Sequence, residues 1–194
     1  MTGTRGRIVL IILIATLAAA PAAAEQRGGP RGDKAVSMNP IGLLGTFGGL
    51  LDLQYEMRRS ADNSIALRAD IGGQSWGAYN SYTAFGVGGM YRMWPGKKAL
   101  REWYWGPAAS VNFLSITVQD PRGVTSNSSS GVAVGIGAEG GYQYIFPSGI
   151  LLDGSLGLRL VIGSLKASVG NYSSTVPLSG LGFFLRGGVG YAWK

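Results

Sequence analysis

Neither cysteine nor histidine occurs among the 194 residues of the chain. The absence of cysteine excludes a disulfide framework and a lipid-modified N-terminal cysteine. The absence of histidine excludes a Ser-His-Asp triad, and a transition-metal site would have to rely on carboxylates alone. The sequence therefore predicts no catalytic residues, no metal ligands and no cofactor.

Charge is also scarce in this chain. Charged residues make up 14% of it, whereas a typical soluble domain carries about 25%. The formal net charge is +7, but the basic residues are spread along the chain without a dense cluster. Such a distribution does not indicate nucleic-acid binding. Glycine is abundant instead, with 33 residues.

The N-terminus has the features of a secretory signal peptide. Arg5 and Arg7 precede an apolar run at 8–20, and small residues at 22–24 form an Ala-x-Ala site before Glu25. The run is shorter than the roughly 20 residues that a membrane-spanning helix needs. We therefore expect a cleaved signal peptide at 1–24, a flexible segment at 25–34 and one folded domain at 35–194.

The rest of the chain alternates with a period of two, most clearly at 181–193, where large apolar residues alternate with small or charged ones. Successive side chains of a strand point to opposite faces, so each such segment has one apolar face. The pattern predicts strands at 35–45, 48–59, 63–73, 81–94, 104–118, 130–146, 149–167 and 180–193. An even number of strands of this length is typical of an all-β, eight-stranded antiparallel up-and-down transmembrane β-barrel.

The predicted connections alternate in length. Tight turns are expected at 59–63 and 146–149. Longer stretches rich in Ser, Asn and Gly, at 73–80, 119–130 and 166–179, are expected to be cell-surface loops. The segment 95–103 is long for a turn at the periplasmic end of a barrel.

The period alone does not say which face points outward, because a soluble lipocalin-like barrel would place the apolar face inside. The other face carries mostly Gly, Ala and Ser with scattered charges, and it would suppress association in water poorly. Turned inward, its small residues relieve crowding and its charges can pair with one another. We therefore expect an interior charge network formed by Glu56, Arg68, Asp70, Arg92, Glu139, Asp153, Arg159 and Arg186.

Aromatic residues gather near the ends of the predicted strands. In transmembrane barrels such residues form girdles at the two membrane interfaces. The expected interface aromatics are Tyr91, Trp94, Trp103, Tyr104, Trp105, Tyr142, Tyr144, Tyr191 and Trp193.

The alternation and three short motifs carry a family resemblance. The motifs are Asn39-Pro40-Ile41-Gly42, Leu53-Gln54-Tyr55-Glu56 and Gly88-Gly89-Met90-Tyr91-Arg92. They look like uncharacterised bacterial outer-membrane barrel families, and the whole pattern resembles the small Gram-negative outer-membrane proteins of the A and X type. The resemblance implies residence in the outer membrane, contact with its lipids and lipopolysaccharide, and insertion by the barrel-assembly machinery. Such proteins commonly end on an aromatic residue, whereas here Trp193 is followed by Lys194.

Three further motifs have simpler interpretations. Residues 135–140 match the G-x-G-x-x-G spacing of dinucleotide sites, but they lie inside a predicted strand rather than before a helix. Residues 31–33 spell Arg-Gly-Asp, which we interpret as coincidence beside the first strand. The acid pairs Asp52 with Glu56 and Glu139 with Asp153 could serve acid–base chemistry, and an ion-pair role is favoured.

These observations favour a non-catalytic integral outer-membrane barrel with a structural or surface-interaction role through the segments 119–130 and 166–179. The sequence indicates no particular surface ligand. Three alternatives remain open at this point: a narrow porin-like pore, a lipid-modifying enzyme that works without histidine, and a soluble periplasmic lipocalin-like ligand carrier.

Overall fold

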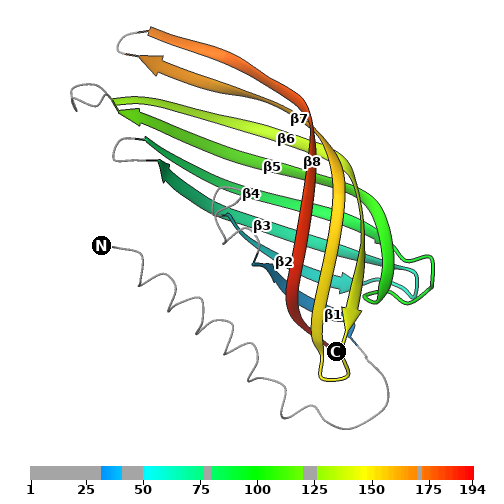
Figure 1. Ribbon diagram of the computed structural model, residues 1–194. Coiled ribbons are helices and arrows are strands. Elements are labelled where there is room, and N and C mark those ends of the chain that lie inside the picture. The colour runs from blue at the N-terminus through cyan, green and yellow to red at the C-terminus, as the bar shows by residue number, and fades with distance from the viewer. Residues whose placement is uncertain (1–31, 41–49, 77–79, 120–125, 170–171) are drawn as a thin grey trace, which may run out of the picture.

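The chain forms an all-β barrel. The computed structural model describes residues 32–40, 50–76, 80–119, 126–169 and 172–194. The strands are β1 (Lys34–Asn39), β2 (Leu50–Arg58), β3 (Asn63–Trp76), β4 (Asn80–Met93), β5 (Glu102–Gln119), β6 (Ser126–Ile145), β7 (Ile150–Val169) and β8 (Tyr172–Trp193). Each strand pairs antiparallel with the next, and β8 pairs with β1 to close the ring (Figure 1). The predicted eight-stranded antiparallel barrel is confirmed.

The two sides of the barrel differ in height. β1 has 6 residues and β2 has 9, whereas β8 has 22. The closing ladder runs only from Lys34↔Trp193 to Met38↔Val189, while the β7–β8 ladder continues to Val169↔Tyr172. β5 to β8 therefore extend well beyond β1 and β2 at one end, as Figure 1 shows. We call this the tall end, and we call the opposite end, which contains the turns 59–62, 94–101 and 146–149, the turn end.

The polar stretches expected as surface loops are mostly strand, so that prediction is wrong for their described parts. β3 continues to Trp76, β6 begins at Ser126, and β7 and β8 run through most of 166–179. A segment rich in Ser, Asn and Gly has the composition of a loop. Strands nevertheless pair through backbone hydrogen bonds, so such residues can form a strand where both of its faces meet water. The strand expected at 35–45 ends at Asn39, and 41–45 lies outside the described residues, as does the predicted signal peptide.

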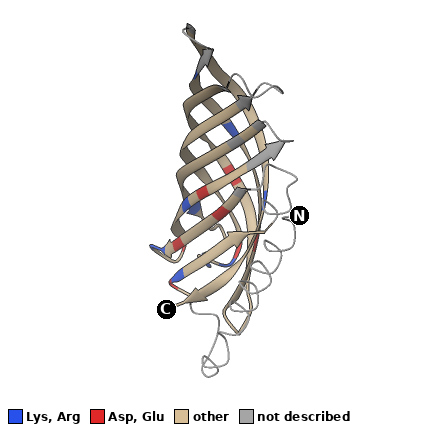
Figure 2. Cartoon of the chain, turned by 90° about the vertical axis from the view of Figure 1, so that its left-hand side faces the viewer, with Lys and Arg blue, Asp and Glu red and all other residues tan. Residues whose placement is uncertain are grey.

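Large apolar side chains cover the outside of the barrel. Exposed ones occur on all eight strands, among them Leu67 (55%), Leu158 (52%) and Phe183 (68%). The charged residues lie mainly in the half of the barrel where the C-terminus lies, and few lie toward the tall end (Figure 2). Water-soluble domains bury such apolar residues and expose charges, so the arrangement here is inverted. No helix in the described ranges is long and apolar enough to cross a membrane.

Candidate functional site

Small apolar clusters fill the interior at the turn end. Ala66, Met90, Trp94 and Tyr104 form one cluster, and the Trp94 and Tyr104 rings lie 5.1 Å apart. The other cluster consists of Ala35, Leu100, Ile145, Leu151 and Ala192. Trp94, Leu100 and Leu151 are each 1% exposed. These groups close the interior at this end.

The segment between β4 and β5 contributes to that closure, which explains its length. Leu100 has a φ of 69°, and Lys97 and Glu102 also have positive φ values. Non-glycine residues rarely adopt this conformation. Here hydrogen bonds hold the segment in place, since Ala99 N donates to Ala61 O at 2.9 Å and Gln143 Nε2 donates to Leu100 O at 2.9 Å. The connection is thus folded back so that Leu100 enters the barrel.

Two residues expected in the aromatic girdle are inside the barrel, and the prediction for them is wrong. Trp94 donates from Nε1 to Ser64 Oγ at 2.9 Å, and Tyr104 donates from its hydroxyl to Asp153 Oδ1 at 2.7 Å. Trp94 has the same parity as Met90 and Arg92, which are also buried, so the alternation of β4 places it inside. Exposed fractions of 36–69% place most of the other expected aromatics on the outer surface, namely Tyr91, Trp103, Trp105, Tyr142, Tyr144 and Trp193; Tyr191 is half-buried.

Arg92 lies at the centre of a polar layer directly above these apolar clusters. Its Nη1 donates to Glu56 Oε2 at 2.7 Å, and its Nη2 donates to Asp153 Oδ2 at 3.1 Å. Its guanidinium also lies 3.9 Å from the centre of the Tyr104 ring. Side chains from β2, β4, β5 and β7 therefore meet around one fully buried cation.

Two further arginines extend the layer toward the tall end. Arg68 binds Glu139 in a bidentate manner, with both N–O distances at 2.5 Å. Arg186 donates from Nε to Asp52 Oδ2 at 2.6 Å and from Nη1 to Asp153 Oδ2 at 3.0 Å. The Arg68–Glu139 pair joins β3 to β6 across the interior, and the Arg186–Asp52 pair joins β8 to β2. Asp153 and Arg186 lie on the neighbouring strands β7 and β8.

The structure does not bring Asp70 and Arg159 into this network. Within the described part of the chain, no cation lies within 4.0 Å of the Asp70 carboxylate and no carboxylate lies within 4.0 Å of the Arg159 guanidinium. Both side chains instead line a cavity of about 600 Å³ that lies above the network, toward the tall end. The six other predicted network residues are paired.

Sequence reasoning missed several members of the network. Gln54 accepts hydrogen bonds from Arg68 and Arg92, Gln143 accepts one from Arg92, and Ser64 donates to Glu56 Oε1 at 2.5 Å. Gln54 lies two residues before Glu56, and Gln143 lies four residues after Glu139. They share the inward face with these acids, so the same alternation could have identified them.

The motifs that the sequence presented have structural explanations. Residues 135–140 lie inside β6, and a side chain at Gly135 would collide with the Arg159 side chain and come within 2.8 Å of Ser110 Oγ. In the Arg-Gly-Asp tripeptide, Asp33 forms an exposed ion pair with Arg58 at 3.6 Å, and Arg31 lies outside the described residues. Glycine at 135 thus serves close packing.

The acid pairs considered for acid–base chemistry are held by arginines. Asp52 pairs with Arg186, Glu56 and Asp153 with Arg92, and Glu139 with Arg68. Each of these carboxylates accepts charge-assisted hydrogen bonds from an arginine. No group of three or more carboxylates with metal-binding spacing occurs in the described ranges. The arrangement supports a structural role for these acids.

Comparisons with known proteins add little to this description. No protein-family model matches the chain, and no curated protein matches it. A solved structure, the translocator domain of autotransporter NalP from Neisseria meningitidis, aligns with a TM-score of 0.47 and 13% sequence identity, over 95% of this chain and 70% of that chain. The strand pairing itself shows an eight-stranded antiparallel β-barrel, and membership of a particular outer-membrane family stays a prediction.

Proposed function

We propose that the chain is a non-catalytic integral outer-membrane barrel with a structural or surface-interaction role. The observation that carries the proposal is the belt of exposed apolar side chains on all eight strands, which encloses an interior holding buried charges. Lipid solvates such a belt, whereas water does not. A closed ring also leaves fewer backbone groups unpaired in hydrocarbon. A soluble lipocalin-like carrier would need the opposite arrangement.

The proposal includes an orientation. The start of β1 and the end of β8 both lie at the turn end, beside the three described turns. A chain that enters the membrane from the periplasm would leave this end on the periplasmic side. The tall end would then face the outside of the cell, where Ser173, Ser174 and Thr175 of β8 are exposed. These strand extensions are the surface that we propose for contact with other molecules.

The interior argues against a pore. Trp94, Leu100 and Leu151 are almost fully buried at the turn end, and Arg92 with its partners fills the layer above them. Eight-stranded barrels have an interior that side chains can fill. We therefore expect no discrete conductance in planar bilayers.

The interior also offers little to a lipid-modifying enzyme. Inside the barrel, the Ser64 hydroxyl contacts the Glu56 carboxylate, which places a potential nucleophile beside a potential base. Ser64 is 0% exposed and Glu56 is 1% exposed. A nucleophile must reach its substrate, so this pair supports packing rather than chemistry.

Fractionation of cells tests the membrane location. We expect the chain in the outer-membrane fraction, with a folded form that migrates differently from the heated form on a gel. Leu158→Asp, which places a charge on the apolar belt, should reduce insertion, whereas Ser148→Asp in a turn should not. Recovery of the folded wild-type chain in the soluble periplasmic fraction would overturn the proposal.

The absence of cysteine makes the orientation directly testable. Single cysteines at Ser174, at the tall end, and at Ser148, in the β6–β7 turn, are both exposed positions. A maleimide that does not cross membranes should label the first on intact cells and the second only after lysis. Labelling of Ser148→Cys alone on intact cells would reverse the orientation and remove the surface role.

A further inference from the structure

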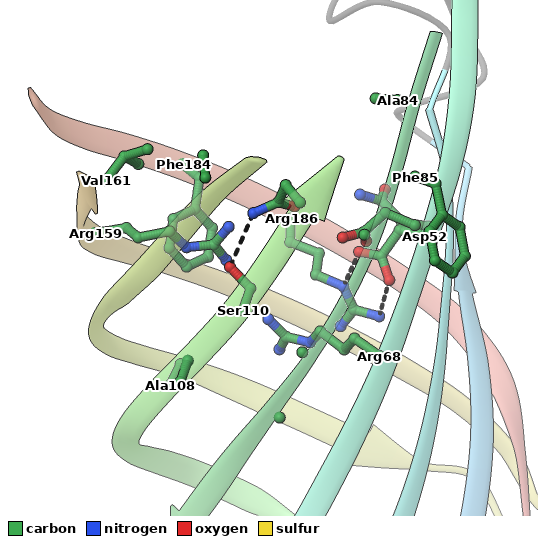
Figure 3. A pocket seen from close by; sticks show the side chains of 18 of the residues that line it. Asp52, Arg68, Ala84, Phe85, Ala108, Ser110, Arg159, Val161, Phe184 and Arg186 are labelled. Carbon is green, nitrogen blue, oxygen red and sulfur yellow. Dashed lines mark hydrogen bonds and ion pairs between the residues drawn. The ribbon is translucent and has the colours of Figure 1, made fainter. Parts of the chain in front are cut away.

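The cavity above the ion network has the size of a small-molecule site. Its volume of about 600 Å³ falls within the roughly 300–1,000 Å³ of typical ligand pockets. Figure 3 shows Arg159, Val161 and Phe184 on one wall and Asp52 and Ala84 on the other. Asp70, Arg159, Val161 and Phe184 are half-buried rather than buried, so solvent reaches the space.

Arg159 differs from the other arginines of the interior. Arg68, Arg92 and Arg186 each have a carboxylate oxygen within 3.1 Å. The Arg159 guanidinium has none within 4.0 Å among the described residues and lies 4.9 Å from the centre of the Phe184 ring. Charged groups that leave bulk water are normally paired. An anion from outside the chain would supply the partner that the Arg159 guanidinium lacks within the described ranges.

Asp70 is the acidic residue in the same situation as Arg159, because no cation lies within 4.0 Å of its carboxylate among the residues that the structure describes. It faces the same cavity from β3, and its Oδ2 lies over Gly86, where an added Cβ would come within 2.9 Å of it. Gly135 leaves room for Arg159 in the same way. The other charged groups that line the cavity, Asp52, Arg68 and Arg186, are paired. The cavity thus presents one available cation and one available anion.

The wall between these charges and the tall end is apolar. Leu114, Val161 and Phe184 point inward from β5, β7 and β8 and line the cavity, together with Ala84. An interior that served only to pair charges has no need of exposed apolar side chains beside them. They provide a surface for an alkyl chain, whose burial contributes about 0.8 kcal/mol per methylene group.

We infer that the cavity binds a single-chain amphipathic molecule with a zwitterionic headgroup. Its anionic group binds Arg159, its ammonium group donates to Asp70, and its alkyl chain lies along Leu114, Val161 and Phe184. Arginine suits a phosphate or carboxylate because its guanidinium donates two parallel hydrogen bonds. The inference goes beyond the proposed membrane role, because it concerns the interior and not the belt.

Native mass spectrometry of the chain in dodecyl maltoside tests the inference. The probes are lysophosphatidylethanolamine, lysophosphatidic acid, which lacks the ammonium group, and glycerophosphoethanolamine, which lacks the chain. We expect one lysophosphatidylethanolamine per barrel and weak retention of the other two. Retention of glycerophosphoethanolamine alone would identify a free headgroup as the ligand and overturn the role of the apolar wall.

Variants separate the cavity from the outer surface. Arg159→Gln should weaken binding at least about tenfold, which corresponds to 1.4 kcal/mol, and Asp70→Asn should shift the preference toward lysophosphatidic acid. Lys166→Gln removes a charge from an exposed position of the same strand and should change nothing. Val161→Trp fills the cavity and should abolish binding of every probe.

The heat-dependent gel shift confirms that each variant is folded before binding is compared. If Arg159→Gln does not fold, Val161→Trp decides the question. Equal retention by wild type and folded Val161→Trp would show that the probe sits on the outer belt only, and it would overturn the inference. A soluble chain that still binds the probe would refute the membrane proposal while leaving the cavity assignment intact.

Discussion

In the described part of the chain, the charged side chains in the barrel interior are paired toward one end, whereas Arg159 and Asp70 toward the other end are not. Toward the turn end, Arg92 is fully buried among Glu56, Asp153 and the Tyr104 ring. Toward the tall end, Arg159 and Asp70 border a cavity without an ion-pair partner within 4.0 Å among the described residues. Both sets of residues come from the same inward face of the strands. The difference shows that sharing a face is not enough for pairing, because closure must also bring opposite charges within contact distance.

A buried ion pair is weak evidence for net stabilisation, since desolvation offsets much of the attraction between the charges. Breaking such a pair is nevertheless costly, because the remaining charge stays buried. The comparison between the two ends therefore predicts large effects from the paired groups and small ones from the unpaired groups.

The largest effect is expected from Arg92→Met. It leaves the Glu56 and Asp153 carboxylates without their central cation and should lower the free energy of unfolding by about 3–5 kcal/mol. Arg159→Met removes the same chemical group from the cavity and should cost less than about 1 kcal/mol. Urea titration of the folded barrel in vesicles measures both. Equal losses of unfolding free energy in Arg92→Met and Arg159→Met would contradict the difference between paired and unpaired charges.

A smaller effect is expected from Tyr104→Phe. It removes the hydroxyl that donates to Asp153 at 2.7 Å and should lower stability by about 2 kcal/mol, since hydrogen bonds to charged groups contribute roughly 1.5–3 kcal/mol. Tyr142→Phe makes the same change on the outer surface, where Tyr142 is 39% exposed, and it should be almost neutral. The same titration distinguishes them, and a larger loss from Tyr142→Phe would contradict the inward placement of Tyr104.

The smallest effect is expected in the exposed β2–β3 turn. The Ser60 hydroxyl donates to the Asp62 carboxylate and lowers the pKa of Asp62. A lowered pKa in the folded state adds stability above the unfolded pKa, and this contribution disappears as the pH falls through the folded pKa. Ser60→Ala should therefore be slightly less stable than wild type at neutral pH and equally stable in acid.

Nuclear magnetic resonance titration of Asp62 in both proteins provides the direct check. The midpoint should move up toward that of an ordinary aspartate in Ser60→Ala. An unchanged midpoint would show that the hydroxyl does not hold the carboxylate in solution.

Part of the interior could be predicted from alternation alone. Residues 103–105 show how far this rule reaches, because three consecutive aromatic residues of a strand cannot all face outward. Trp103 and Trp105 are exposed, and Tyr104 between them is buried, which the period requires. Trp94 could be assigned in the same way, because it shares its parity with the buried Met90 and Arg92. Leu100 could not, since it lies in the connection between β4 and β5, where the period of the strands does not apply.

The sequence by itself determined the number of strands and the parity of their side chains, because these depend on the local geometry of an extended chain. Its scarce charges and abundant glycine indicated that the apolar face points outward. Only the tertiary structure decided which charges pair. Arg68 on β3 meets Glu139 on β6, and Arg186 on β8 meets Asp52 on β2. Neither pair lies on neighbouring strands, so the contacts exist only because the ring closes and brings distant strands to face one another at matching heights.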